Sequence, residues 1–380
     1  MVRLHMVDLG GQYAKIKSEI DQSIHEVLDS TVFIGGPVVN AFKVSLQSYL
    51  NVKHVIPCAN GTDSLQIALM ALDLQPGDEV ILPAFTYVAT AEVIALLKLK
   101  PIMVDVYIDD FNVNVDEIRS HITSKTKAIV PVHLFGQCTR MEAIMKIAED
   151  HRLHVIEDNA QAIGSDYIFK NGQVQKAGTI SHVGSTSFFP SKNLGCYGDG
   201  GALFTNDDAL ANKMRMIANH GQGSTRYYHD AVGVNSRLDA IQAAVLNVKL
   251  KHLDEYAAKR REAADYYDAA FSIISSLITP YRNTHSTHVF HQYTLRVTDG
   301  SRDALKAHLD EKGIPNAIYY PVPLYKQKAY KNYGDPNMFL PITEQLSNEV
   351  ISLPIHTELN PEIQDIIIGE VHSFFNSFIP

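Results

Sequence analysis

Residues 187–201 have the sequence SFFPSKNLGCYGDGG, and this stretch restricts the fold and the chemistry more than any other part of the chain. An apolar strand pattern leads into Lys192, and a glycine-rich turn follows it. The glycines fit neither the nucleotide P-loop, which needs Gly-Lys-Ser/Thr, nor the dinucleotide fingerprint, which opens a helix after the first strand. They do allow tight backbone around a lysine. Most single lysines are solvated, so the role of Lys192 depends on what neighbouring strands bring to it.

Short apolar runs alternate with amphipathic ones through the first two-thirds of the chain. They predict strands at residues 54–57, 79–82, 102–106, 128–132, 154–157, 185–189 and 201–204, and helices at 63–72, 89–97, 115–122 and 141–149. Strands separated by helices imply right-handed crossovers. We therefore predict an α/β fold in which a mixed, mostly parallel seven-stranded sheet lies between helices.

The pattern changes after Asn235. Helical patterns at residues 238–253 and 255–271 precede a strand at 291–297, a helix at 301–312 and an extended segment near 318–320. We interpret this part as a smaller α+β domain. The predicted division places the large domain at residues 1–250 and the small C-terminal domain at residues 251–380.

Ligands of open parallel sheets collect beyond the carboxyl ends of the strands, so the residues predicted there are the candidates for function. Gly61 and Thr62 follow the first strand at the start of a helix, where free N–H groups and a hydroxyl suit a phosphate. A plain helix cap would use similar residues. Tyr87 follows the second strand, where its ring could stack on a planar ligand or pack at the rim of the core.

Glu157 and Asp158 end the fifth strand, and strand alternation directs them to opposite faces. A buried carboxylate needs a partner, which is a protonated ring nitrogen in one interpretation and a cap or salt bridge in the other. Together with Lys192, an aromatic and a phosphate turn, such an aspartate describes a pyridoxal-phosphate (PLP) site. There the lysine forms a Schiff base, and the aspartate keeps the ring nitrogen protonated.

Several ordered motifs extend this interpretation. They are CANGTDSLQIA (58–68), PAFTYVATAE (83–92), VHLFGQ (132–137), EDNAQAIGS (157–165), SFFPSKNLGCYGDGGA (187–202), HGQ (220–222), VGVNSRLDAIQAA (232–244) and YYPVPLYKQ (319–327). Over roughly residues 7 to 356 the chain resembles the DegT-type nucleotide-sugar aminotransferases, which are PLP enzymes of fold type I, the aspartate aminotransferase fold. His133 and His220 lie in these motifs too, and for His133 a structural role competes with a place in the active site.

The resemblance implies a role for each matching residue. Lys192 would carry the cofactor and move the proton between substrate and cofactor carbons. The cofactor-binding set would be Gly61, Thr62, Tyr87, Asp158, Gln161, Ser187, Lys192 and Asn235. Within this set, Gln161 would lie near the ring and its phenolic oxygen, and Ser187 would help to hold the phosphate. Asn235 would reach the phosphate of the partner subunit's cofactor, which implies a homodimer with shared active sites.

The resemblance also implies the reaction. An amino donor, usually L-glutamate in this family, loads the cofactor, and a keto-sugar then takes the amine in a ping-pong order. The motifs around Lys192 and Arg237 most resemble those of enzymes that make UDP-2-acetamido-3-amino-2,3-dideoxy-glucuronate from its 3-keto precursor. Arg237 would then bind the sugar carboxylate, with an interface salt bridge as the alternative. Tyr319 and Tyr320 would contact the substrate.

Two departures leave other substrates open. That subgroup has His-Tyr-Pro where this chain has Tyr319-Tyr320-Pro321, and it usually has Ala at the position of Asn159. A 4-keto nucleotide sugar and an eight-carbon octulosonate therefore remain alternatives. So do a PLP-binding regulatory protein without turnover and a PLP dehydratase or isomerase, although a dehydratase branch of the family has His in place of Lys192.

Composition bears on location and partners. The chain has 380 residues, of which 33 are Lys or Arg and 42 are Asp or Glu. Its formal net charge of −9 gives no electrostatic attraction to nucleic acid or to an anionic membrane. It has neither an apolar run of ~18 residues nor a secretory signal pattern. Three scattered cysteines predict free thiols in a reducing cytoplasm, and the histidine spacing predicts no metal site. The family implies work in cell-surface polysaccharide biosynthesis, including that of lipopolysaccharide.

Overall fold

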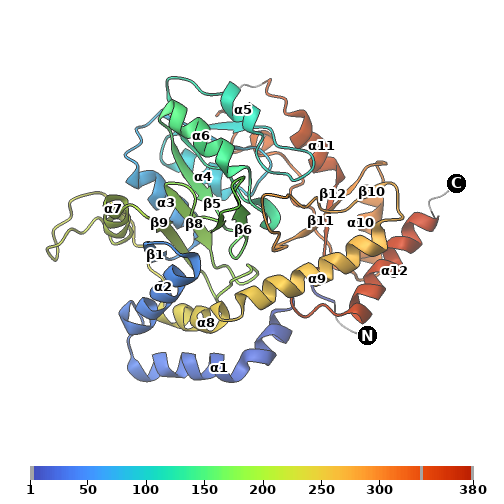
Figure 1. Cartoon of the computed structure of the whole chain (residues 1–380), viewed down its shortest axis with the longest axis horizontal. Coiled ribbons are helices and arrows are strands. Elements are labelled where there is room, and N and C mark those ends of the chain that lie inside the picture. The colour runs from blue at the N-terminus through green and yellow to red at the C-terminus, as the bar shows by residue number, and fades with distance from the viewer. Residues whose placement is uncertain (1–3, 334–336, 378–380) are drawn as a thin grey trace.

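The computed structural model describes residues 4–333 and 337–377. A seven-stranded sheet with the order β1-β9-β8-β5-β4-β2-β3 forms its centre (Figure 1). Its strands are β1 (His54–Cys58), β2 (Glu79–Pro83), β3 (Lys100–Val104), β4 (Thr126–Ile129), β5 (His154–Asp158), β8 (Val183–Ser187) and β9 (Gly201–Thr205). Strand β9 is antiparallel to β1 and β8, and the other neighbours are parallel. The prediction of a mixed, mostly parallel sheet is confirmed.

Helices cover both faces of this sheet, because consecutive strand residues are apolar and point to opposite sides. On one face, Ile56, Leu82 and Ile156 share a cluster with α3 (Gly61–Ala71), α4 (Ala89–Leu96) and α7 (Asp208–Ala218). On the other face, their neighbours along the strands pack against α2 (Gly36–Leu50), α5 (Val115–Ser120), α6 (Met141–His151) and α8 (Ala240–Leu250). The predicted helices at 63–72, 89–97, 115–122 and 141–149 are confirmed within a few residues at each end.

A second sheet lies apart from the first. It has three antiparallel strands, β10 (Leu277–Ile278), β11 (Tyr293–Val297) and β12 (Val350–Leu353), and its core cluster also includes residues of α9 (Leu253–Phe271), α10 (Arg302–Glu311) and α12 (Pro361–Ser377). Helix α9 extends from the end of α8 to this sheet (Figure 1), and α11 (Pro341–Glu349) leads into β12. The predicted strand at 291–297 and helix at 301–312 are present, and the division into 1–250 and 251–380 stays a prediction.

Some local predictions were wrong or incomplete. The segment near 318–320, predicted to be extended, is not part of a sheet strand, and beside it Ala317 forms an isolated bridge with Ser352. The helical pattern at 238–253 breaks after Leu250, and α9 begins at Leu253. Sequence patterns did not predict α1 (Leu9–Ser30), α2, or the hairpin of β6 (Asp166–Ile168) and β7 (Val174–Lys176). Helix α1 buries Ile16, Ile20 and Val27 at helical spacing, a pattern that is present in the sequence although this helix was not among those predicted.

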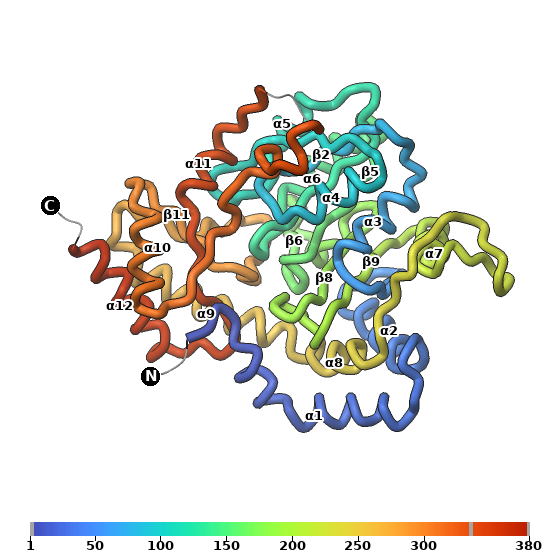
Figure 2. Tube along the Cα trace, turned by 180° about the vertical axis from the view of Figure 1, so that it is seen from behind, coloured from blue at the N-terminus to red at the C-terminus, as the bar shows by residue number. Residues whose placement is uncertain are grey.

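Two features of the surface bear on function. The segment between α7 and α8 projects from the body in both views (Figure 1, Figure 2), and it exposes Tyr227, Tyr228 and Val232.

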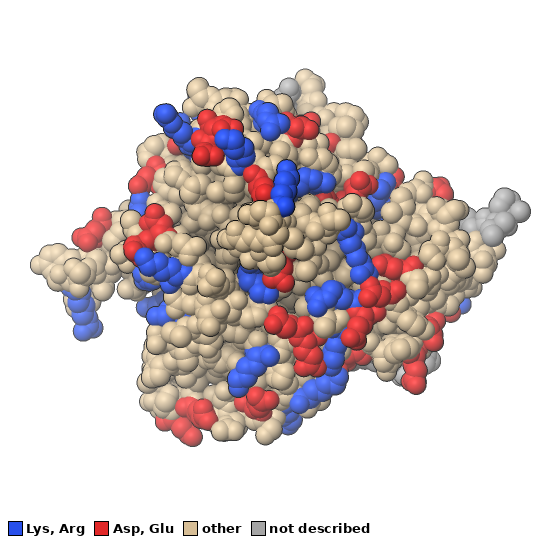
Figure 3. Space-filling model, viewed as in Figure 1, with Lys and Arg blue, Asp and Glu red and all other residues tan. Residues whose placement is uncertain are grey.

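On the face seen in Figure 3, basic and acidic side chains are intermixed. In the part of the chain that the structure describes, no helix combines the length and the apolarity needed to cross a membrane.

Candidate active site

The loops that follow β1 and β8 meet at the carboxyl edge of the large sheet. A Cβ atom on Gly61 would lie 2.6 Å from the Cβ of Ser187, so only glycine allows this approach. Asn60 caps α3 by accepting a hydrogen bond from the Asp63 N–H at 2.7 Å. Within residues 4–333 and 337–377, the N–H groups of Gly61 and Thr62 have no hydrogen-bond partner. The helix N-terminus therefore offers free donors beside Ser187, as an anion site requires.

Asp158 ends β5 as a buried carboxylate. Its Oδ2 accepts a hydrogen bond from Thr90 Oγ1 at 2.9 Å, and its Oδ1 accepts one from the Ala160 N–H at 3.1 Å. Burial raises the pKa of Asp158, while the two hydrogen bonds and the charge of Lys192 oppose that rise. A cation at this carboxylate would stabilise its ionised form. Thr90 lies in the first turn of α4, and no sequence pattern had indicated its role.

Lys192 follows β8 in a partly buried position, and its backbone N–H is bonded to the Phe189 carbonyl at 2.9 Å. Burial lowers the pKa of its ammonium to about 8, against the opposing effect of the Asp158 charge. The two predicted site residues are thus electrostatically coupled across the strand ends. A lysine with such a pKa is partly neutral near physiological pH, as a nucleophile or a base must be.

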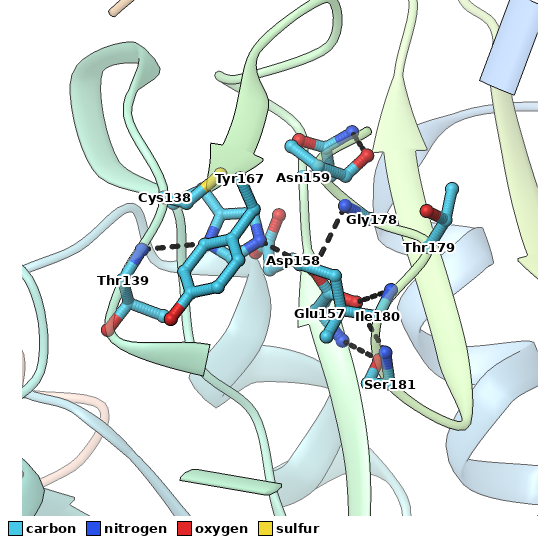
Figure 4. A network of polar contacts seen from close by, with 12 residues as sticks. Cys138, Thr139, Glu157, Asp158, Asn159, Tyr167, Gly178, Thr179, Ile180 and Ser181 are labelled. Carbon is cyan, nitrogen blue, oxygen red and sulfur yellow. Dashed lines mark hydrogen bonds and ion pairs between the residues drawn. The ribbon is translucent and has the colours of Figure 1, made fainter. Parts of the chain in front are cut away.

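Glu157 faces the opposite side of β5 and forms a closed network of polar contacts (Figure 4). Its carboxylate accepts hydrogen bonds from His133 Nε2 at 2.8 Å and from the N–H groups of Gly178, Ile180 and Ser181 at 2.7–2.9 Å. Burial raises the pKa of Glu157, but His133 and the backbone donors outweigh it and hold that pKa below its usual value. His133 therefore has the structural role that competed with an active-site role.

Asn159 also has structural contacts. It is fully buried, and its Nδ2 donates to the Ala177 carbonyl at 3.0 Å. A Cβ on Gly178 would lie 2.8 Å from that nitrogen, so Asn159 packs tightly under the 177–178 turn. The departure from Ala at this position is thus explained by packing beside β5.

An aromatic wall borders the strand ends. Gln161 links it to the sheet, because its Oε1 accepts from the Phe135 N–H at 2.8 Å and its Nε2 donates to the Tyr320 hydroxyl at 3.1 Å. The ring of Tyr320 stacks on Phe135, with centroids 6.5 Å apart, and lies 6.5 Å from the ring of Tyr87. Tyr87 is 59% exposed and so leaves its ring open to a ligand. The ring of Tyr319 lies 6.0 Å from that of Tyr320.

Asn235 and Arg237 lie on the surface beside the same edge. Ser236 between them anchors the segment, because its Oγ accepts a hydrogen bond from the Ala59 N–H at 3.0 Å. Among the described residues, Arg237 has neither a hydrogen bond nor an ion pair. The structure thus groups Gly61, Thr62 and Ser187 in one place and couples Asp158 with Lys192, while Asn235 and Arg237 remain at the rim.

A surface hollow elsewhere is separate from this site. It is lined by residues of α6, by Phe169 and by the rings of His154 and His182. Because His154 begins β5 and Asp158 ends it, the hollow lies at the opposite edge of the sheet. It contains none of the predicted site residues.

Comparisons with known proteins agree with the fold and the chemistry. The model of the DegT/DnrJ/EryC1/StrS aminotransferase family matches residues 14–372. Over 98% of this chain and 99% of the relative, the chain is 44% identical to a "Pleiotropic regulatory protein" of Geobacillus stearothermophilus. It is 45% identical to the UDP-2-acetamido-2-deoxy-3-oxo-D-glucuronate aminotransferase of Pseudomonas aeruginosa, over 94% of this chain and 96% of the relative.

One related protein has been solved with a bound cofactor. NtdA from Bacillus subtilis, determined with its bound cofactor PMP, is 31% identical to the chain, with a TM-score of 0.87 over 95% of this chain and 82% of that one. The predictions of a fold type I enzyme, of a PLP-dependent aminotransferase and of its cofactor are confirmed. The chain belongs to the DegT/DnrJ/EryC1/StrS aminotransferase family.

Proposed function

We propose that this protein transfers an amino group from L-glutamate to a 3-keto nucleotide-sugar acid such as UDP-2-acetamido-3-keto-glucuronate. The observation that carries the proposal is the placement of the two residues at neighbouring strand ends: the buried Asp158 ends β5, and Lys192 follows β8, which pairs with β5. The 45% identity to an aminotransferase named for that substrate supports the sugar class. Arg237 supports the carboxylate, because an exposed guanidinium without an internal partner is available to bind one.

The residues at the strand ends fit the cofactor. The free N–H groups of Gly61 and Thr62, with Ser187 in contact, suit its phosphate, and a side chain at position 61 would fill that space. Asp158 is buried and suits a protonated ring nitrogen, which would offset the cost of its burial. The exposed ring of Tyr87 suits stacking.

In the proposed mechanism each residue has one task. Bound PLP supplies an electron-accepting ring that stabilises negative charge on the substrate carbon. Asp158 holds a proton on the ring nitrogen, and Thr90 and the Ala160 N–H hold Asp158 in place. Lys192 moves the proton from the donor's α-carbon, and its lowered pKa leaves part of it neutral for that step.

Further residues would orient the substrates. Gln161 holds Tyr320 through its amide and keeps the aromatic wall in position beside the strand ends. Tyr319 and Tyr320 would contact the sugar, and Arg237 its carboxylate. Asn235 would complete the phosphate site of the partner subunit in a homodimer, which its exposed position allows. We place this enzyme in the cytoplasm, in the synthesis of cell-surface polysaccharides such as lipopolysaccharide.

The test is a substrate screen. Purified protein is loaded with PLP and L-glutamate and offered 3-keto and 4-keto nucleotide sugars and keto-sugar acids, and the products are identified by mass. Amination of the 3-keto uronate in preference to its uncharged analogue supports the proposal. Equal or greater amination of a 4-keto nucleotide sugar or of an octulosonate would reassign the substrate, which Tyr319 in place of the subgroup's histidine leaves open.

A regulatory protein is the second candidate. It is favoured by the 44% identity to a relative named as a pleiotropic regulatory protein. That candidate predicts PLP binding without transfer of the glutamate amine to any keto-sugar. The same screen separates the two candidates, because transfer to any one keto-sugar with many turnovers per subunit excludes a purely regulatory role.

A further inference from the structure

His291 is a buried imidazole that the proposed mechanism does not use. It lies just before β11, and only 5% of its surface is exposed. Its Nδ1 is enclosed without a hydrogen-bond partner. Within the described part of the chain, Nε2 of His291 and Nζ of Lys192 also lack hydrogen-bond partners. Unpaired polar groups are costly inside a protein, so a ring left in this state is expected to have a partner during function.

Three contacts fix the segment 289–291 beside the active-site lysine. The side chain of Asn193, which follows Lys192, donates a hydrogen bond to the Val289 carbonyl at 2.7 Å. Arg260 donates to the Phe290 carbonyl at 2.9 Å. A Cβ on Gly136 would lie 2.9 Å from the N atoms of Phe290 and His291, so the loop after β4 packs directly on them. The backbone of this segment is thus held from three sides.

The charges around His291 keep its ring neutral. Burial is the main cause that holds its pKa well below the usual value, and the nearby charges of Lys192 and Arg260 lower it further. No acidic group contributes to the pKa of His291, whereas the charge of Asp158 raises the pKa of Lys192. A neutral imidazole retains a lone pair on one nitrogen, so it can accept a hydrogen bond from an ammonium.

We propose that His291 is a positioning residue for Lys192, whose amine donates a hydrogen bond to the imidazole when pyridoxamine phosphate occupies the site. This inference rests on the proposed function, in which the amino donor would displace Lys192 from the cofactor and Lys192 would bind it again when the aminated sugar leaves. The imidazole then holds the amine close to the reacting carbon between its proton transfers. A hydrogen-bond acceptor here would also stabilise the protonated lysine, in addition to the charge of Asp158.

The experiment compares His291→Leu, which removes the acceptor, with His291→Asn, which keeps one. The protein is loaded with pyridoxamine phosphate, so that Lys192 is free, and its amine is labelled with methyl acetimidate over a range of pH. Peptide mass spectrometry gives the midpoint of labelling at Lys192. We expect His291→Leu to lower this midpoint by about one pH unit. We also expect it to slow the conversion of the PLP-bound protein by L-glutamate, measured in a single turnover, about tenfold. His291→Asn should stay near the wild type in both measurements.

A matched control separates this role from packing. His288 is also buried on the same segment, but its Nδ1 already accepts the Phe290 N–H at 3.0 Å, and Arg282 rather than Lys192 acts on it. His288→Asn should leave the labelling midpoint of Lys192 unchanged. A wild-type midpoint in His291→Leu, a raised midpoint, or equal shifts in the Leu and Asn variants would overturn the proposal for His291 alone.

The proposed function has its own control in the same samples. If wild-type protein binds PLP and L-glutamate converts the bound cofactor, the proposed function stands, whatever the result for His291. Wild-type protein that fails this conversion overturns the proposed function, and the role of His291 falls with it.

Discussion

Gly61 lies directly against Ser187, although one follows the first strand and the other ends β8. Because a Cβ on Gly61 would stand 2.6 Å from the Cβ of Ser187, the free N–H groups of α3 and the Ser187 side chain share one small space. This contact joins the two halves of the proposed phosphate site. The contact also places the start of α3, whose capping sequence is found in many helices, beside the end of β8, the strand that precedes Lys192.

Gly61→Ala is therefore expected to weaken cofactor binding. The added methyl group must displace Ser187, and we expect the Kd for PLP to rise about tenfold or more. Equilibrium binding, followed by the visible absorbance of PLP bound to Lys192, measures this change. Gly369→Ala is the control, since a Cβ on Gly369 in α12 has no neighbouring atom within 4 Å. Equal Kd values in both variants would contradict the assignment of the phosphate site.

Asp158→Asn should reduce turnover strongly while the protein still folds. An amide cannot neutralise a protonated ring nitrogen, so the cofactor loses its capacity to accept electrons, and we expect kcat to fall about a hundredfold or more. Steady-state kinetics with L-glutamate measure the loss. Thr90→Val removes one of the two hydrogen bonds to the carboxylate and should give a smaller decrease. Near-wild-type activity in Asp158→Asn would mean that another carboxylate serves the ring.

The sequence predicted most of the large sheet, because its strands are short apolar runs whose faces are both buried. It also predicted that Glu157 and Asp158 diverge, since alternation alone requires it. Thr90 could not be found in this way, because a threonine in the first turn of a helix has no distinctive pattern. Helix α1 is different, because Ile16, Ile20 and Val27 recur at helical spacing and could have identified it.

The partners of His133 and Asn159 were equally hidden from the sequence. Both side chains bind backbone groups or residues far along the chain, and such pairs follow from tertiary packing rather than from local spacing. Family motifs identified the positions but not their tasks. Only the contacts showed that His133 supports Glu157 and that Asn159 supports the 177–178 turn.

Glu157→Gln should destabilise the fold by about 3 kcal/mol at pH 7, because a buried carboxylate with four donors is replaced by an amide with two N–H groups of its own. The folded pKa of Glu157 lies below its usual 4.5, so its ionised form stabilises the fold above that pH. This stabilisation is lost as the pH falls through the folded pKa. Urea unfolding at pH 7 and at lower pH should therefore show a shrinking difference between the two proteins.

Glu362→Gln is the control for that experiment, because Glu362 is exposed on α12. It should change the free energy of unfolding by less than about 0.5 kcal/mol. A difference for Glu157→Gln that stays constant, or that grows as the pH falls, would show that the ionised carboxylate does not stabilise the fold.

In the protein without cofactor, the effect of Lys192 on the free energy of unfolding should have the opposite sign to that of Glu157. Its folded pKa of about 8 is below the ordinary 10.5, so the unfolded chain binds the proton more tightly. Lys192→Met should abolish turnover and yet stabilise the fold by on the order of 2 kcal/mol at pH 7. That gain should decrease between pH 8 and 10.5, where the folded lysine is already neutral. Unfolding free energies measured across this range test the sign, and a gain that increases with pH would refute it.

Arg237→Ala should raise the apparent KM for carboxylate-bearing keto-sugars at least tenfold, with little change for uncharged ones. A bidentate guanidinium–carboxylate pair contributes to ground-state binding, so kcat should change less than KM. The control is Arg119→Ala, because Arg119 is exposed and pairs with Asp116 on α5, far along the chain from the proposed site. Kinetics with a matched pair, one 3-keto uronate and its 6-hydroxyl analogue, measure the discrimination. If Arg237→Ala affects both sugars equally, Arg237 acts at the subunit interface, and the carboxylate must be bound by another residue.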